Sequence, residues 1–296
     1  MLRACVMVWA VLTSATPTDD WRALLHAERS TAGDLELGGQ IVGAASGQTR
    51  YVHYEDLLRL PLETYTAGND SNFQGKTEIS GVALSVLAET FGSSTDMVVA
   101  ICNDQYQAHY PADYIAAHHP LLVLRINGQD RERWPTTPGG DALGPYLISH
   151  ARFEPSFKVL AHEDEPQIPY GVVRLDFRKE SEVYGPIRPP GKWTTDSPVG
   201  MGYAIARQDC FRCHNMGAEG GTMAQRPWLQ LAAIADKHPE KFRRIIRDPV
   251  SVTPGAKMPG QPGYDDATLD ALTAYFKTFA GQDVKLGNAP GDHEQQ

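Results

Sequence analysis

The sequence has few cysteines, no excess of positive charge and no long apolar run. Four cysteines in 296 residues are too few for a disulfide-stapled scaffold. The 27 Lys and Arg stand against 36 Asp and Glu, and the net charge of −9 argues against nucleic acid as a partner. No apolar run reaches the roughly 18 to 20 residues that a bilayer span needs. At 42% hydrophobic and 21% charged residues the composition is globular, and the length suggests two domains.

Residues 1–15 have the order of a secretory signal peptide. A basic start at Arg3 precedes the apolar run 4–12, and the small residues 13–15 follow. The alternative is a buried first helix. We expect cleavage near residue 15, which would remove Cys5, place the mature chain in the periplasm or otherwise outside the cytoplasm, and leave no membrane span.

Residues 16–180 predict an α+β domain. They carry 13 basic and 23 acidic side chains, and short β-branched runs alternate with short helical patterns. The predicted strands are 39–44, 50–53, 77–80, 97–103, 121–126, 146–149 and 172–177. The predicted helices are 55–59, 82–91 and 111–117.

The second half of the chain has a different composition. Residues 181–196 are rich in Pro and Gly and predict an interdomain linker without regular structure. Residues 197–282 have a helical pattern and predict an all-α domain, in which 197–281 hold 10 basic and 8 acidic residues. Residues 283–296 are polar and predict a flexible tail.

The motif Cys210-Phe211-Arg212-Cys213-His214 is the C-x-x-C-H pattern of covalent c-type haem attachment. Two thiols on one helical turn can each form a thioether, and the next residue then supplies an imidazole to the iron. A bare C-x-x-C is also found in redox dithiols and in half of a zinc site. A second cysteine pair for zinc is missing from the sequence, so we expect one covalent haem c.

His214 then provides one axial ligand, and a second is needed for a low-spin iron. We predict Met258, which Pro259 and Gly260 place in an extended loop. The alternatives are that Met258 is only a packed side chain, and that the sixth position is open or is occupied by His238.

With this motif and its predicted ligands, residues 197–282 resemble a class I cytochrome c. Gly202 and Ala206 are small residues where the first helix of that family crosses its last helix. The last helix is expected over 265–279, with Asp265 or Asp266 as N-cap. Its predicted apolar face consists of Leu269, Leu272, Tyr275 and Phe276. The resemblance also implies that the carbonyl of Pro227 accepts a hydrogen bond from Nδ1 of the proximal His214, which would orient the ring.

The first domain resembles the molybdopterin-binding fold of sulfite-oxidase-type oxidoreductases. The resemblance rests on segments 98–108, 111–114, 120–128 and 144–148. In that family a cysteine at a strand end binds molybdenum, and Cys102 falls at the matching place. The family's basic residues for the pterin phosphate are not evident, so we expect a cofactor-free relative, no molybdenum cofactor, and a structural role for Cys102. The remaining polar groups that could carry chemistry, which are His109, His118, His119, His150, Asp104 and the acids 163–165, are expected on the solvated surface.

The function predicted from these features is an exported monohaem c-type cytochrome. It would pass single electrons between periplasmic redox proteins through a His/Met-ligated haem, as a carrier without a catalytic residue of its own. The alternatives are a haem-molybdenum oxidoreductase of sulfite-dehydrogenase type and a haem sensor with an open sixth site.

Overall fold

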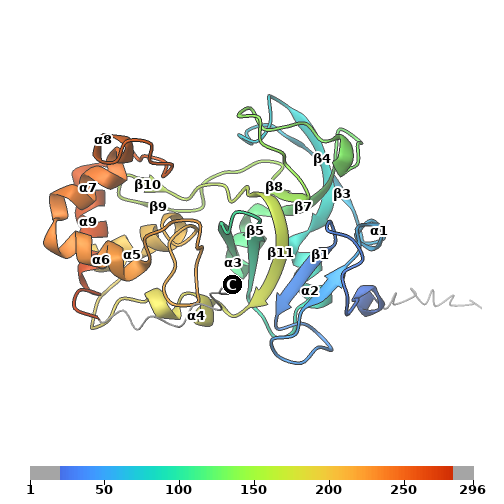
Figure 1. Ribbon diagram of the computed structural model, residues 1–296, viewed down its shortest axis with the longest axis horizontal. Coiled ribbons are helices and arrows are strands. Elements are labelled where there is room, and N and C mark those ends of the chain that lie inside the picture. Colours follow the sequence, from blue (N-terminus) through green and yellow to red (C-terminus); the bar gives the residue numbers. More distant parts are fainter. Residues whose placement is uncertain (1–20, 283–296) are drawn as a thin grey trace, which may run out of the picture.

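The structure is a computed structural model that describes residues 21–282. The predicted signal peptide, 1–15, and the predicted tail, 283–296, lie outside the described residues. Figure 1 shows two parts of different architecture, a sheet-rich part built from the first half of the chain and a helical part built from its last third. The predicted order, an α+β domain followed by helices, is confirmed.

The sheet-rich part alternates strands with short helices. Its sheet strands are β1 (Leu35–Gly39), β2 (Arg50–Val52), β3 (Glu63–Ala67), β4 (Thr77–Ala83), β5 (Met97–Cys102), β6 (Gln107–Pro111), β7 (Leu121–Ile126), β8 (Tyr146–Ser149) and β11 (Tyr170–Arg178). Its helices are the 3-10 turns η1 (Trp21–Leu24) and η2 (Arg131–Arg133) with α1 (Tyr54–Leu57), α2 (Leu84–Phe91) and α3 (Ala112–His118).

Within residues 21–282 nine strands form one mixed sheet, in the order β2-β1-β11-β8-β7-β4-β3, with β5 joined to β11 and to β6. The pairs are antiparallel except for β1 with β11, where Leu37 lies opposite Leu175. Strands β8 and β5 pair with successive stretches of β11. The largest buried cluster packs the sheet against α2 and α3, as expected for an α+β domain. A second, smaller cluster includes Ile79 and Leu147 of the sheet, and Met97 and Val99 of β5 belong to the cluster of the helical part.

Several sequence-based boundaries were wrong. The first strand is Leu35–Gly39 and not 39–44, because the buried side chains are Leu35 and Leu37, and Gly39 has a φ of +73° that ends the strand. Helix α2 begins at Leu84, since residues 82 and 83 continue β4. Strands β3 and β6 were not predicted, because their polar residues hide the pattern of burial.

The helical part contains α5 (Pro198–Asp209), α6 (Trp228–Lys237), α7 (Pro239–Arg247), α8 (Pro249–Val252) and α9 (Asp266–Lys277). As predicted, α9 is capped by Asp265, whose side chain accepts a hydrogen bond from Thr268 N at 2.8 Å. Helices α5 and α9 cross at Gly202, where a Cβ would overlap the carbonyl oxygen of Ala271. The predicted apolar face of α9 is buried.

The expectation of a linker without regular structure at 181–196 was wrong for residues 181–187, whereas residues 188–196 contain no helix or strand. Helix α4 (Glu180–Val183) and the 3-10 turn η3 (Gly185–Ile187) form there. Pro186 is the second residue of η3 and lies in its first turn, where no backbone N–H is required. Val183, Tyr184 and Ile187 are buried in the apolar cluster of the helical part. The segment is therefore part of that core.

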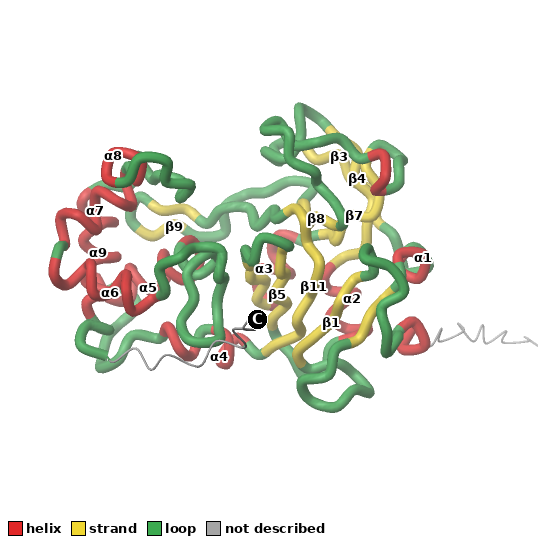
Figure 2. Tube along the Cα trace, viewed as in Figure 1, coloured by secondary structure: helices red, strands yellow, loops and turns green. Residues whose placement is uncertain are grey.

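A hairpin from the first part of the chain also packs on the helices. It consists of β9 (Lys158–Val159) and β10 (His162–Glu163), and β9 lies beside the helices in Figure 2. Ala161 N donates a hydrogen bond to Thr268 Oγ1 at 3.0 Å. The two parts are thus joined by more than the chain between them. Among the helices of residues 21–282, none has both the length and the apolar character needed to span a bilayer.

Candidate haem-attachment site

The motif Cys210 to His214 forms one turn that follows α5 directly. The backbone N–H groups of Cys213 and His214 both donate to the carbonyl oxygen of Cys210, at 3.2 and 3.0 Å. Both thiols are free. The turn therefore presents two thiols and the following imidazole together, as the spacing predicts.

The acidity of the two thiols argues against a redox dithiol. Burial raises the pKa of Cys210 above its ordinary value and raises that of Cys213 to about 11. Cysteines of reactive C-x-x-C pairs have lowered pKa values, because the thiolate is the nucleophile. The environment of this pair favours neutral thiols and so disfavours the dithiol alternative.

His214 is oriented by one short hydrogen bond. Its Nδ1 lies 2.6 Å from the carbonyl oxygen of Arg226, and only an N–H can bond to a carbonyl. Nε2 is then the atom with a free lone pair, which is the atom that an axial ligand uses. Burial also lowers the pKa of His214 from its ordinary value, which favours the neutral ring.

The acceptor in this bond is Arg226 and not Pro227, which corrects the sequence-based expectation. Pro227 is the N-cap of α6, and its carbonyl accepts from the N–H groups of Gln230 and Leu231 at 2.9 and 3.3 Å. The carbonyl of Pro227 is therefore already engaged by the first turn of α6. Pro227 still has a role, because its fixed φ favours the start of α6 beside His214.

Met258 lies in the loop between α8 and α9. It is partly buried and packs against the same apolar cluster as Cys210 and Met216. Met223 lies on the cysteine side, with its Sδ 3.9 Å from Cys213 Sγ, and its side chain is exposed. Met258 thus packs on the core that adjoins the motif, and its role as a ligand stays a prediction.

The loop after the motif packs tightly on it and requires glycine. Gly220 has a φ of +88°, and a Cβ there would overlap the ring of Phe211. A Cβ on Gly221 would overlap the carbonyl oxygen of Arg212. These two glycines let the loop close over the backbone of the motif.

The turn between β5 and β6 contacts the motif directly, which the sequence did not reveal. Gln107 N donates to the carbonyl oxygen of Arg212 at 2.9 Å, and Thr222 N donates to that of Gln105 at 3.2 Å. Arg212 Nη1 lies 3.4 Å from Tyr106 Oη. The haem-attachment turn is therefore held between α5 and the sheet-rich part.

This donor set fits a c-type haem. Two unpaired thiols in one turn and a neutral imidazole with a free Nε2 are the groups that covalent attachment and axial ligation require. Cys210 and Cys213 would hold the haem as thioethers, His214 would bind the iron, and Met258 is the soft donor predicted for the opposite side.

The comparisons with known proteins agree with this fit. Residues 198–276 match the family described as cytochrome C oxidase, cbb3-type, subunit III. Over 96 residues the chain is 33% identical to "Cytochrome c oxidase subunit 2" of Bacillus sp. (strain PS3), covering 29% of this chain and 27% of that protein. The chain thus spans about a quarter of that relative's length. These matches support a class I c-type cytochrome domain that binds haem c in residues 198–276 and carries electrons.

The family match does not reach the sheet-rich part, where the resemblance to sulfite-oxidase-type proteins stays a prediction. Cys102 ends β5 and is buried in the apolar cluster of the sheet. Burial raises the pKa of its thiol, which disfavours the thiolate. Both features support a structural role for Cys102.

The expectation that the histidines and acids of this part are solvated was wrong for four of them. His109, His118, His150 and Asp164 are buried. Asp164 accepts a hydrogen bond from Ser156 N at 2.6 Å and lies 3.3 Å from His118 Nε2. His119 is exposed, as expected, because the left-handed backbone at this residue turns the chain away from α3.

Proposed function

We propose that this chain is an exported monohaem c-type cytochrome that transfers single electrons between periplasmic redox proteins. The observation that carries the proposal is the turn Cys210 to His214, with His214 Nδ1 bonded to the carbonyl oxygen of Arg226. In this proposal His214 and Met258 are the axial ligands, and Cys210 and Cys213 form the thioethers.

In this function the side chains of the helical part orient the axial imidazole, exclude water and provide the second ligand. When bound, the haem supplies a one-electron Fe(III)/Fe(II) couple. The bond from His214 to Arg226 fixes the ring and makes Nε2 a better donor. The apolar cluster around Phe211 and Trp228 excludes water, and a soft sulfur donor at Met258 would favour the reduced iron. No proton transfer by the protein is required, so no catalytic residue is assigned.

The sheet-rich part would serve as a docking surface. Residues 16–180 have ten more acidic than basic side chains. Opposite charge on a partner would raise the association rate without creating a tight complex. We therefore expect redox partners with a basic face, and electron exchange that slows at high ionic strength.

The test is to express the full chain in the periplasm of a host that matures c-type cytochromes. The purified protein should carry the mass of one haem, contain one iron and no molybdenum per chain, and give a low-spin reduced-minus-oxidised spectrum. The double variant Cys210→Ser with Cys213→Ser should lose the covalent haem. A colourless wild-type protein of unmodified mass would overturn the proposal.

Met258→Ala distinguishes the ligation states. We expect it to lose the weak methionine-to-iron band and to bind carbon monoxide readily in the ferrous state. Met223→Ala and Met216→Ala are matched controls that should keep both properties of the wild type. Carbon monoxide binding by the untreated wild type would favour the sensor, and stoichiometric molybdenum would favour the oxidoreductase.

A further inference from the structure

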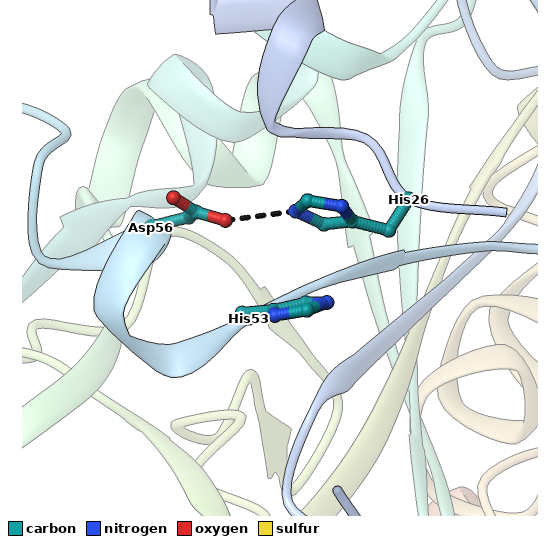
Figure 3. A group of neighbouring side chains, drawn as sticks. All are labelled: His26, His53 and Asp56. Atoms are coloured by element: carbon teal, nitrogen blue, oxygen red, sulfur yellow. Dashed lines mark hydrogen bonds and ion pairs between the residues drawn. The ribbon is translucent and has the colours of Figure 1, made fainter. Parts of the chain in front are cut away.

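His26, His53 and Asp56 lie side by side in the sheet-rich part, where the ring of His53 packs against that of His26 and His26 faces Asp56 (Figure 3). Each side chain offers one ligand atom, and these atoms lie within 4.8 Å of one another. His26 Nε2 is 2.9 Å from Asp56 Oδ2, and the rings of His26 and His53 have centroids 3.8 Å apart. The proposed electron-transfer function makes no use of these three residues.

The backbone holds the three side chains in place before any ligand binds. His26 N donates to the carbonyl oxygen of Tyr51, in the middle of β2, at 2.8 Å, and Tyr51 N donates to that of His26 at 2.9 Å. His53 is the N-cap of α1, and Asp56 lies in the first turn of that helix, three residues further on. Residues at this spacing face the same side of a helix. A short helix and a backbone bridge thus bring two segments to one site.

One ring nitrogen in the group is buried without a partner. His53 Nε2 has no hydrogen bond among residues 21–282, although solvent does not reach it. The nearest carboxylate oxygen, Asp34 Oδ2, is 3.9 Å away and already accepts from the N–H groups of Ser30 and Thr31. Buried polar atoms normally have a partner. His53 Nε2 therefore has no hydrogen-bond partner in the described part of the chain to lose when a cation binds to the group.

We propose that His26, His53 and Asp56 bind one divalent transition-metal ion, and that Zn²⁺ is the ion the site fits best. Two imidazoles and a carboxylate are typical zinc ligands, whereas Ca²⁺ and Mg²⁺ prefer all-oxygen sites. Ligand atoms around tetrahedral zinc lie about 3.3 Å apart. On binding, the 2.9 Å separation of His26 and Asp56 would open and the longer separations, of up to 4.8 Å, would close toward this value, with water completing the shell.

The ion would fasten the segment that carries His26 to the start of α1. Arg59 Nη1 now lies 3.2 Å from Asp56 Oδ1, but its side chain is 64% exposed and can move into solvent. Because the folded chain assembles the site from two separate segments, binding stabilises the folded state. The site therefore predicts both stoichiometric metal and a metal-dependent melting temperature.

The experiment uses the haem-loaded full chain, in which the thiols of Cys210 and Cys213 are consumed. After treatment with a chelator and dialysis against Zn²⁺ alone, elemental analysis should find one zinc per chain. The melting temperature should rise with zinc. X-ray absorption at the zinc edge should show nitrogen and oxygen neighbours and no sulfur.

Two variants and a control decide the assignment. His26→Gln and Asp56→Asn should each weaken zinc binding at least tenfold and remove the rise in melting temperature. Asp56→Asn is nearly isosteric, so it keeps the test valid if His26→Gln folds poorly. His119→Gln is the matched control, because His119 forms a similar pair with Glu63, at 3.0 Å, without a second imidazole. Absence of zinc, unchanged binding in Asp56→Asn, or sulfur neighbours would each overturn the proposal.

Discussion

The imidazole of His109 stacks on the phenyl ring of Phe211, with the two centroids 5.2 Å apart. His109 belongs to β6 of the sheet-rich part, and Phe211 belongs to the haem-attachment turn. Both side chains are buried. Burial lowers the pKa of His109 to about 3, and the charges of Arg212 and Arg207 act in the same direction. The contact between the two parts is therefore made by a neutral imidazole.

This contact predicts a pH dependence of stability. The pKa of His109 is lower in the folded than in the unfolded state, so the unfolded state binds the proton more readily below about pH 6.5. Stability from this group is complete above that pH and is lost as pH falls toward 3. We expect His109→Phe to reduce the slope of the unfolding free energy by about 1 kcal/mol per pH unit between about pH 6 and 5.

Urea denaturation of the haem-loaded protein at pH 7, 6 and 5 measures this slope. Phe is suitable because both ring nitrogens of His109 lack a hydrogen-bond partner among the described residues. His150, whose pKa burial also lowers to about 3, should maintain part of the dependence in the variant. Parallel pH profiles for wild type and variant would contradict the prediction.

A second prediction concerns the crossing of α5 and α9. Gly202→Ala places a methyl group against the carbonyl oxygen of Ala271, and the backbone of α9 cannot move away without shifting the helix. The variant should lose about 2 kcal/mol of unfolding free energy despite the better helix propensity of Ala. Gly263→Ala is the control, since its Cβ meets no atom within 4 Å, and its effect should stay within about 0.5 kcal/mol. Equal effects in chemical denaturation would refute the packing argument.

The sequence was most informative where a short motif or a regular spacing of apolar residues determines the structure. The C-x-x-C-H turn, the N-cap at Asp265 and the apolar face of α9 depend on spacing within a few residues, and they were predicted. Strands β7 and β8 were predicted with their observed bounds, because their apolar runs are continuous.

Features that depend on distant contacts could not be read from the sequence. Strand β6 contains the polar residues Gln107 and His109, and part of its burial comes from the haem-attachment turn that contacts it. The carbonyl that accepts from His214 depends on the residue at which α6 begins. A start one residue earlier or later would change which carbonyl is available to His214, and the sequence does not fix that boundary. The triad of His26, His53 and Asp56 needs the bridge to Tyr51, which joins segments 25 residues apart.

The last prediction concerns the hydrogen bonds between the β9–β10 hairpin and the helices. Tyr264 Oη donates to Asp209, which lies next to Cys210, and is 2.7 Å from Nδ1 of the buried His162. Tyr264→Phe would leave the buried His162 and the partly buried Asp209 with only each other, Nδ1 to Oδ2 at 3.2 Å. The hydrogen bond from Tyr264 to the Asp209 carboxylate is lost, and bonds to charged groups contribute about 1.5 to 3 kcal/mol, so we expect a loss of about 1.5 kcal/mol in unfolding free energy. Tyr170→Phe is the matched control, because Tyr170 donates to Asp141 at 3.0 Å from an exposed position where water can replace it. Its effect should stay below about 0.5 kcal/mol. If the two variants unfold at the same urea concentration, the hairpin contact contributes nothing to the union of the two parts.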